Sequence, residues 1–121
     1  MNVRTMIVDD QPDIRELIRV LIELENGGLE VSCEAGSGRE ALEILDRCRP
    51  NVVVLDEMMP GMNGIEVATK ITERHPGTQM IMCSAYLDAD VTRRGLAAGV
   101  AAFVHKDEIR TIPRLIKTLH A

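Results

Sequence analysis

The fold of this chain is decided by the stretch Val52-Val53-Val54-Leu55-Asp56-Glu57-Met58-Met59-Pro60-Gly61. Four consecutive β-forming residues lead to Asp56, and a Pro-Gly turn follows shortly after it. This pattern is typical of a buried strand that ends by placing a carboxylate at the edge of a sheet. Near the N-terminus, Met6-Ile7-Val8-Asp9-Asp10 repeats the arrangement. The sequence therefore predicts a group of carboxylates at one edge of a sheet.

Carboxylates gathered in this way repel one another. At a separation of about 4 Å and an effective dielectric constant near 20, two like charges cost roughly 4 kcal/mol. We therefore expect a divalent cation at the site around Asp56.

Short apolar runs alternate with amphipathic helical stretches outward from this segment. The predicted strands cover residues 5–8, 29–34, 52–55, 80–83 and 100–104. Apolar residues at helical spacing predict helices that begin near residues 12, 37, 63, 88 and 109. Five strands that alternate with five helices predict an α/β fold, with a doubly wound parallel sheet covered on both faces. We expect one domain over residues 1–121.

Two helix starts carry the spacing of a capping box. Ser37 with Glu40 matches the S-x-x-E pattern, and Asn63 with Glu66 matches it less typically because asparagine replaces serine or threonine. Pro12 falls in the first turn of the first helix, where its missing N–H costs nothing.

Composition and charge exclude several classes of protein. The net charge is −5 and no cluster of lysine and arginine stands out, so we expect no direct nucleic-acid binding. No stretch is long enough to span a membrane, and Asp9 and Asp10 interrupt any signal-peptide pattern, so a cytoplasmic location is the default expectation. The three cysteines are odd in number and far apart, which predicts no disulfide framework. Cys33 and Cys83 fall in strand-like runs and are expected to be small buried hydrophobes.

The ends of the predicted strands carry the residues with chemistry. Ligands of doubly wound sheets bind beyond the carboxyl ends of the strands, and here these ends supply Asp9-Asp10, Asp56, Ser84-Ala85 and His105-Lys106. Each residue alone is typical of a helix cap, a turn or a solvated surface. The acids among them suit Mg²⁺, which prefers oxygen ligands and keeps several waters. No His or Cys joins the acidic cluster, which argues against Zn²⁺. A lysine and a hydroxyl beside the acids suit a phosphoryl group, and a central carboxylate can act as its nucleophile.

These residues resemble the receiver domains of two-component response regulators over essentially the whole chain. The resemblance depends on Asp9-Asp10, on Asp56 followed by Met59-Pro60-Gly61-Met62-Asn63-Gly64, on Ser84-Ala85, and on the run from Ala98 to Lys106. It implies a flavodoxin-like (βα)5 three-layer sandwich with a parallel sheet in the order 2-1-3-4-5.

The resemblance also implies roles for individual residues. Asp56 would accept a phosphoryl group from a histidine kinase or phosphotransfer protein, with Mg²⁺ or Mn²⁺ as cofactor. Asp10 and Asp56 would bind the ion directly, Asp9 mainly through water, and Met58 through its main-chain carbonyl. Lys106 and Ser84 would contact the phosphoryl group, and Ser84 with Phe103 would form the switch.

The switch would reshape the face made by the fourth helix, the fifth strand and the fifth helix. A downstream protein or output domain would read this change, and a phosphorylation-dependent homodimer is one assembly open to such a domain. Enzyme activity is expected only toward the domain's own phosphorylation and dephosphorylation.

Several positions depart from the family pattern or vary within it. Phe103 replaces the tyrosine often found there. Glu57 adds a fourth acid beside Asp56, and we expect it to be a solvated loop residue. By the resemblance, Met58 and Tyr86 would flank the phosphoryl group, and the small Ala85 would leave space for it. We predict that the bulky Tyr86 restricts attacking water and lengthens the phosphorylated lifetime.

Three rival functions fit less well. A haloacid dehalogenase-type phosphatase would need a second Asp where Met58 stands, and a flavodoxin-like electron carrier would need a phosphate-binding first loop in place of Asp9-Asp10-Gln11-Pro12-Asp13. A receiver-like interaction module that works without phosphorylation stays open as the main alternative, although the full set of acids, serine and lysine argues against it.

Overall fold

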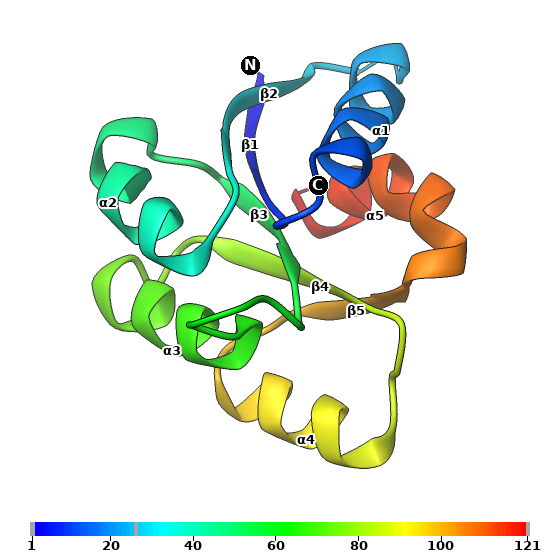
Figure 1. The fold of residues 1–121 in the computed structure, drawn as a ribbon. Helices are drawn as coiled ribbons and strands as arrows, with labels where there is room; N and C mark the ends of the chain where they lie inside the picture. The colour runs from blue at the N-terminus through cyan, green and yellow to red at the C-terminus, as the bar shows by residue number, and fades with distance from the viewer. Residues whose placement is uncertain (1, 26, 121) are drawn as a thin grey trace.

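The computed structural model of the chain describes residues 2–25 and 27–120, in which strands and helices alternate (Figure 1). The strands are β1 (Val3–Val8), β2 (Leu29–Ala35), β3 (Val52–Asp56), β4 (Gln79–Ser84) and β5 (Ala102–His105). The α-helices are α1 (Pro12–Leu24), α2 (Gly38–Cys48), α3 (Gly64–Arg74), α4 (Ala89–Ala97) and α5 (Ile112–His120), and a 3-10 helix (Lys106–Thr111) precedes α5. None of the helices among these residues has the length and apolar character needed to cross a bilayer.

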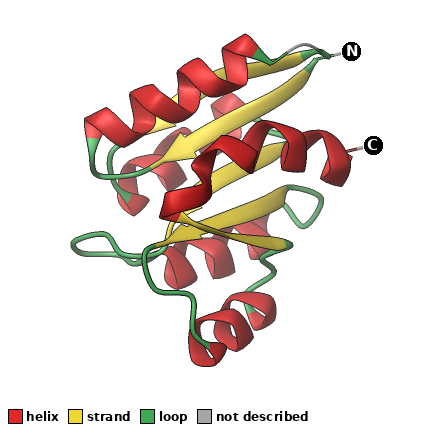
Figure 2. Cartoon of the chain, turned by 90° about the vertical axis from the view of Figure 1, so that its right-hand side faces the viewer, coloured by secondary structure: helices red, strands yellow, loops and turns green. Residues whose placement is uncertain are grey.

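All strand pairs are parallel, and the sheet order is β2-β1-β3-β4-β5. The predicted fold class and strand order are therefore confirmed. Strands β1 and β3 lie inside the sheet with a neighbour on each side, whereas β2 and β5 form its edges. Figure 2 shows the sheet between its helices.

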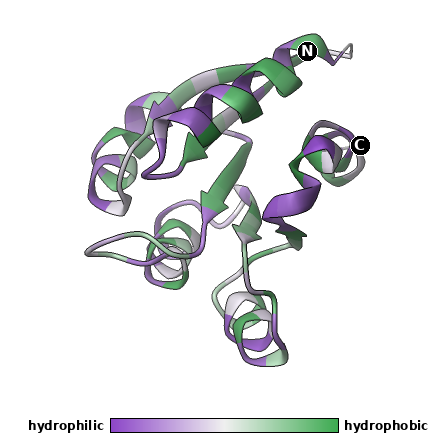
Figure 3. Cartoon of the chain, turned by 45° about the vertical axis from the view of Figure 1, so that its right-hand side comes forward, coloured by the Kyte–Doolittle hydropathy of each residue, from purple (hydrophilic) through white to green (hydrophobic). Residues whose placement is uncertain are grey.

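The core consists of two apolar layers, one on each face of the sheet. Because successive strand residues point to opposite faces, Met6 and Leu55 pack toward α2 and α3, whereas Ile7 and Val54 pack toward α1 and α5. The inner strand β3 is coloured mainly as hydrophobic in Figure 3, as expected for a strand buried on both faces.

Both predicted capping pairs lie at helix starts, but the less typical one is the more complete. At α3, the Asn63 side chain accepts from the Glu66 N–H at 2.9 Å, and the Glu66 carboxylate accepts from the Asn63 N–H at 3.0 Å. At α2, Ser37 accepts from the Glu40 N–H at 3.1 Å, whereas the Glu40 carboxylate accepts from the N–H of Gly36 at 2.6 Å. The full reciprocal box therefore forms only at α3, next to the loop that follows Asp56.

The last helix departs from the prediction, which began it near Ile109. Residues 106–111 form a 3-10 segment that is kinked at Glu108, and α5 begins only at Ile112. An α-helix through Ile109 would bring the ring of Pro113 against the Ile109 carbonyl, and Pro113 has no N–H to donate to it. In the first turn of α5, by contrast, Pro113 is tolerated.

The prediction that the chain carries no disulfide is wrong. Cys33 of β2 and Cys48 at the end of α2 are bonded, with their Cα atoms 6.4 Å apart, which is within the usual range. Their separation of 15 residues along the chain did not indicate a pair, which is formed by the packing of α2 against β2. Cys83 is free and buried, and its burial raises the pKa of the thiol to about 12. It is the small buried hydrophobe that the sequence predicts.

Candidate functional site

Strand ends place polar side chains at one edge of the sheet. Asp9 and Asp10 follow β1, Asp56 ends β3, Ser84 ends β4, and Lys106 follows β5. Because β1, β3, β4 and β5 are consecutive neighbours in the sheet, their carboxyl ends lie side by side. The structure thus brings together, at one edge of the sheet, the residues that the sequence analysis predicts for the site.

The three aspartates form a compact oxygen cluster. One carboxylate oxygen from each of Asp9, Asp10 and Asp56 lies within 4.8 Å of the others. Asp9 and Asp56 are only 2% and 3% exposed. One oxygen of Asp9 accepts from the Gln11 N–H at 2.9 Å, and one of Asp56 accepts from the Met58 N–H at 3.3 Å. A cluster whose donors are all oxygen atoms suits Mg²⁺, a hard cation that prefers carboxylates and water.

Lys106 supplies the positive charge nearest to the buried acids. Its Nζ lies 3.2 Å from Oδ1 of Asp56 and 3.4 Å from Oδ2 of Asp9. Burial lowers the pKa of Lys106, but the charges of Asp56 and Asp9 outweigh burial and leave this pKa above its usual value. Lys106 is therefore protonated at neutral pH and can bind an anion.

One lysine does not compensate the negative charge around Asp56. Burial and the charge of Asp9 raise the pKa of Asp56 from 3.8 to about 6, against the opposing effect of Lys106. The ionised form is thus held under electrostatic and desolvation cost. A divalent cation between the acids would lower that cost by neutralising their charge.

Ser84 lies at the predicted strand end, but its hydroxyl forms hydrogen bonds with Glu57 and Tyr86 and not with Asp56. Its Oγ lies 3.0 Å from Oε1 of Glu57, accepts from the Tyr86 N–H at 3.0 Å, and lies 3.0 Å from the Tyr86 carbonyl. The expectation that Glu57 is a solvated loop residue is wrong, since Glu57 is half-buried and bonded to Ser84. No sequence signal marks this contact, because it joins two side chains from different strand ends.

The residues predicted to tune the site lie at its rim. Met58 and Tyr86 are 62% and 72% exposed, and Ala85 is also exposed. Their side chains are therefore on the surface rather than in the core, and their tuning roles stay predictions.

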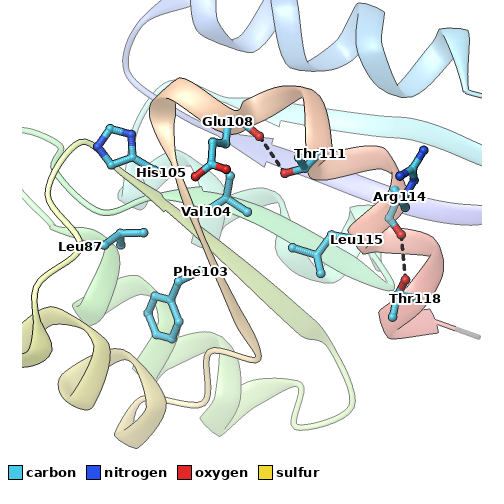
Figure 4. Close-up of a pocket in the computed structure, with 9 residues that line it drawn as sticks. All are labelled: Leu87, Phe103, Val104, His105, Glu108, Thr111, Arg114, Leu115 and Thr118. Carbon is cyan, nitrogen blue, oxygen red and sulfur yellow. Dashed lines mark hydrogen bonds between the residues drawn. The ribbon is translucent and has the colours of Figure 1, made fainter.

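Phe103 on β5 is half-buried and packs against α4. A Cβ atom added to Gly95 of α4 would lie 2.6 Å from two carbons of the Phe103 ring, so the ring touches the helix backbone there. Figure 4 shows that the ring points toward α4 and lines a groove with residues of β5 and α5. The lining residues are Leu87, Phe103, Val104, His105, Glu108, Thr111, Arg114, Leu115 and Thr118. The predicted switch aromatic thus lies on the face formed by α4, β5 and α5.

Known proteins share both this sequence pattern and this fold. The chain is 35% identical over 106 residues to the chemotaxis protein CheY of Thermotoga maritima, an alignment that covers 88% of this chain and 87% of that protein. The signal receiver domain of the response regulator NarL from Mycobacterium tuberculosis superposes with a TM-score of 0.90 at 33% identity, covering 98% of this chain and 95% of that one.

A longer relative shares only part of its length with this chain. The protein-glutamate methylesterase/protein-glutamine glutaminase 3 of Hahella chejuensis is 36% identical over 123 residues, covering 94% of this chain but 35% of that protein. The chain thus spans about a third of the length of that enzyme. The model of the response regulator receiver domain matches residues 5–119. With the strand order and the acidic cluster, this match shows that the chain belongs to the family of response regulator receiver domains.

Proposed function

We propose that this domain accepts a phosphoryl group on Asp56 in a Mg²⁺-dependent reaction and passes the change to the face formed by α4, β5 and α5. The observation that carries this proposal is the place of Asp56. It is buried at the end of an inner strand, 3.2 Å from Lys106 and in one oxygen cluster with Asp9 and Asp10.

The acidic residues fit a role as ligands of the metal ion. We expect Asp10 and Asp56 to bind Mg²⁺ directly, Asp9 to act mainly through water, and the main-chain carbonyl of Met58 to complete the protein ligands; Mn²⁺ would suit the same oxygens. When bound, the ion would neutralise charge on the oxygens of the transferring phosphoryl group.

The transfer itself requires a nucleophile and counter-charges for the phosphoryl oxygens. An oxygen of the Asp56 carboxylate attacks the phosphorus of a phosphohistidine on a sensor histidine kinase or phosphotransfer protein. The P–O bond forms as the P–N bond breaks, and the imidazole nitrogen keeps the electron pair. Lys106 pairs with one phosphoryl oxygen, and the Ser84 hydroxyl donates to another.

The conformational response follows from what Ser84 does on phosphorylation. When Ser84 moves toward the phosphoryl group, the space that it leaves lets Phe103 turn inward. The groove beside β5 then changes shape. A downstream protein or output domain binds according to this change, and a phosphorylation-dependent homodimer would form through the same face. We place this signalling in the cytoplasm. We expect residues 1–121 to act as one domain that contacts neither nucleic acid nor membrane. The domain acts as a phosphoacceptor and not as an enzyme on other substrates.

The test is phosphorylation by a small donor. Wild-type protein incubated with acetyl phosphate and Mg²⁺ should gain one phosphoryl group by intact mass spectrometry, and the gain should vanish without Mg²⁺ or in Asp56→Asn. Well-folded protein that gains nothing would refute the proposal and favour an interaction module that works without phosphorylation.

A further inference from the structure

A glutamate next to Asp56 binds the hydroxyl of Ser84. Oε1 of Glu57 lies 3.0 Å from Oγ of Ser84, which is 1% exposed. Within the described residues, the other partners of this hydroxyl belong to the main chain of Tyr86. A hydroxyl has one hydrogen to donate, and a carboxylate is a stronger acceptor than a carbonyl. Glu57 is therefore the favoured acceptor of the Ser84 hydrogen.

The main chain of Glu57 is fixed on both sides. Its N–H donates to the Cys83 carbonyl at 2.9 Å, and its carbonyl accepts from the Gly64 N–H at 2.9 Å. Gly64 approaches so closely that an added Cβ atom would lie 2.8 Å from the Cα of Glu57. The carboxylate therefore reaches Ser84 from a backbone that has little freedom to move, which favours a well-defined contact.

We propose that Glu57 is a positioning residue that holds Ser84 in its resting place and so opposes the phosphorylated conformation. This inference rests on the proposed function, in which Ser84 donates to a phosphoryl group on Asp56. The single hydrogen of Ser84 cannot serve Glu57 and the phosphoryl oxygen together. The equilibrium between the two conformations then depends on the difference between these two contacts.

Charge acts in the same direction as this competition. A phosphoryl group on Asp56 adds about −1.5 to −2 of charge next in sequence to the Glu57 carboxylate. Glu57 consequently disfavours the phosphorylated state in two ways, by retaining Ser84 and by direct repulsion. Only the first of these depends on the Ser84 hydroxyl, and this difference makes the two effects separable.

The experiment is a double-mutant cycle with beryllofluoride, a phosphoryl mimic, at saturating Mg²⁺. Binding can be followed by tyrosine fluorescence, because Tyr86 is the single tyrosine of a chain without tryptophan. Glu57→Ala should bind beryllofluoride about tenfold more tightly than wild type through the released hydroxyl, the factor of one hydrogen bond to a charged group. Glu57→Gln keeps an acceptor oxygen and should fall between the two.

The same Glu57→Ala change is then made in Ser84→Ala protein. Loss of charge acts in both backgrounds, so the gain should shrink by about tenfold when Ser84 is absent. An equal gain in both backgrounds would show that Glu57 acts by charge alone and would overturn the inference, as would no gain at all. A wild-type domain that neither binds beryllofluoride nor gains a phosphoryl group would instead refute the proposed function.

A second measurement needs no phosphoryl mimic. The Tyr86 N–H donates to Ser84 Oγ, so in unphosphorylated Glu57→Ala its hydrogen exchange should be several times faster than in wild type, while exchange in β1 stays unchanged. Unaltered exchange at Tyr86 would contradict a holding role for Glu57.

Discussion

Replacing Asp56 by asparagine should stabilise the metal-free domain at neutral pH. Folding raises the pKa of Asp56 from 3.8 to about 6 through burial and the charge of Asp9. Each tenfold change in the dissociation constant of an acid is worth about 1.4 kcal/mol. The ionised Asp56 therefore lowers the free energy of unfolding by about 3 kcal/mol, a cost that the uncharged asparagine does not carry.

The sign of the pH dependence follows from proton binding. Between about pH 4 and 6 the folded protein holds a proton on Asp56 that the unfolded chain has lost, so the stability of the wild type falls as the pH rises through this range. Asparagine cannot ionise. The difference between variant and wild type should thus be near zero below about pH 4 and reach about 3 kcal/mol above about pH 7.

The assay is urea unfolding of both proteins, followed by circular dichroism from acid to neutral pH in the presence of a chelator. Added Mg²⁺ should narrow the gap, because a ligand that binds only the folded wild type stabilises it. The reasoning is refuted if Asp56→Asn is no more stable at neutral pH, or if its advantage is the same at acid pH.

Three further changes test other parts of the structure. Gly95→Ala should destabilise the domain by about 1–2 kcal/mol in thermal unfolding, because the new Cβ would collide with the Phe103 ring. In a Phe103→Ala background the same change should instead stabilise α4 by about 1 kcal/mol. Destabilisation in both backgrounds would contradict the collision. Asn63→Ala should cost about 1 kcal/mol in urea unfolding by removing the cap of α3, and a neutral result would mean that water replaces the cap. Tyr86→Ala should shorten the lifetime of the phosphorylated domain, measured by the decay of the adduct mass; an equal or longer lifetime would sink the shielding role of Tyr86.

The fold was predictable because its signals are local. Apolar runs such as Val52 to Leu55 define buried strands, and the acids that follow them occur where the carboxyl ends of parallel strands meet. The start of α5 was predicted three residues too early, because the apolar spacing from Ile109 continues a helix that Pro113 does not allow.

Contacts between side chains that are distant in the sequence could not be predicted from it. The bond between Glu57 and Ser84 depends on side-chain torsions and on the main-chain contacts that fix Glu57, and neither leaves a pattern in the residue types. The pairing of Cys33 with Cys48 likewise depends on how α2 packs on β2. Such details follow from tertiary packing, which overrides spacing along the chain.

The edge position of β5 affects which strand of the sheet can move most easily. Among residues 2–25 and 27–120, β1 and β3, which lead to the acids, each pair with two neighbouring strands, whereas β5 pairs with β4 alone. Local opening requires fewer broken contacts at a strand with one neighbour. The strand that carries Phe103 and leads to Lys106 is thus freer to shift than the strands that end at the carboxylates. One small sheet can therefore combine a movable edge with a fixed acidic cluster.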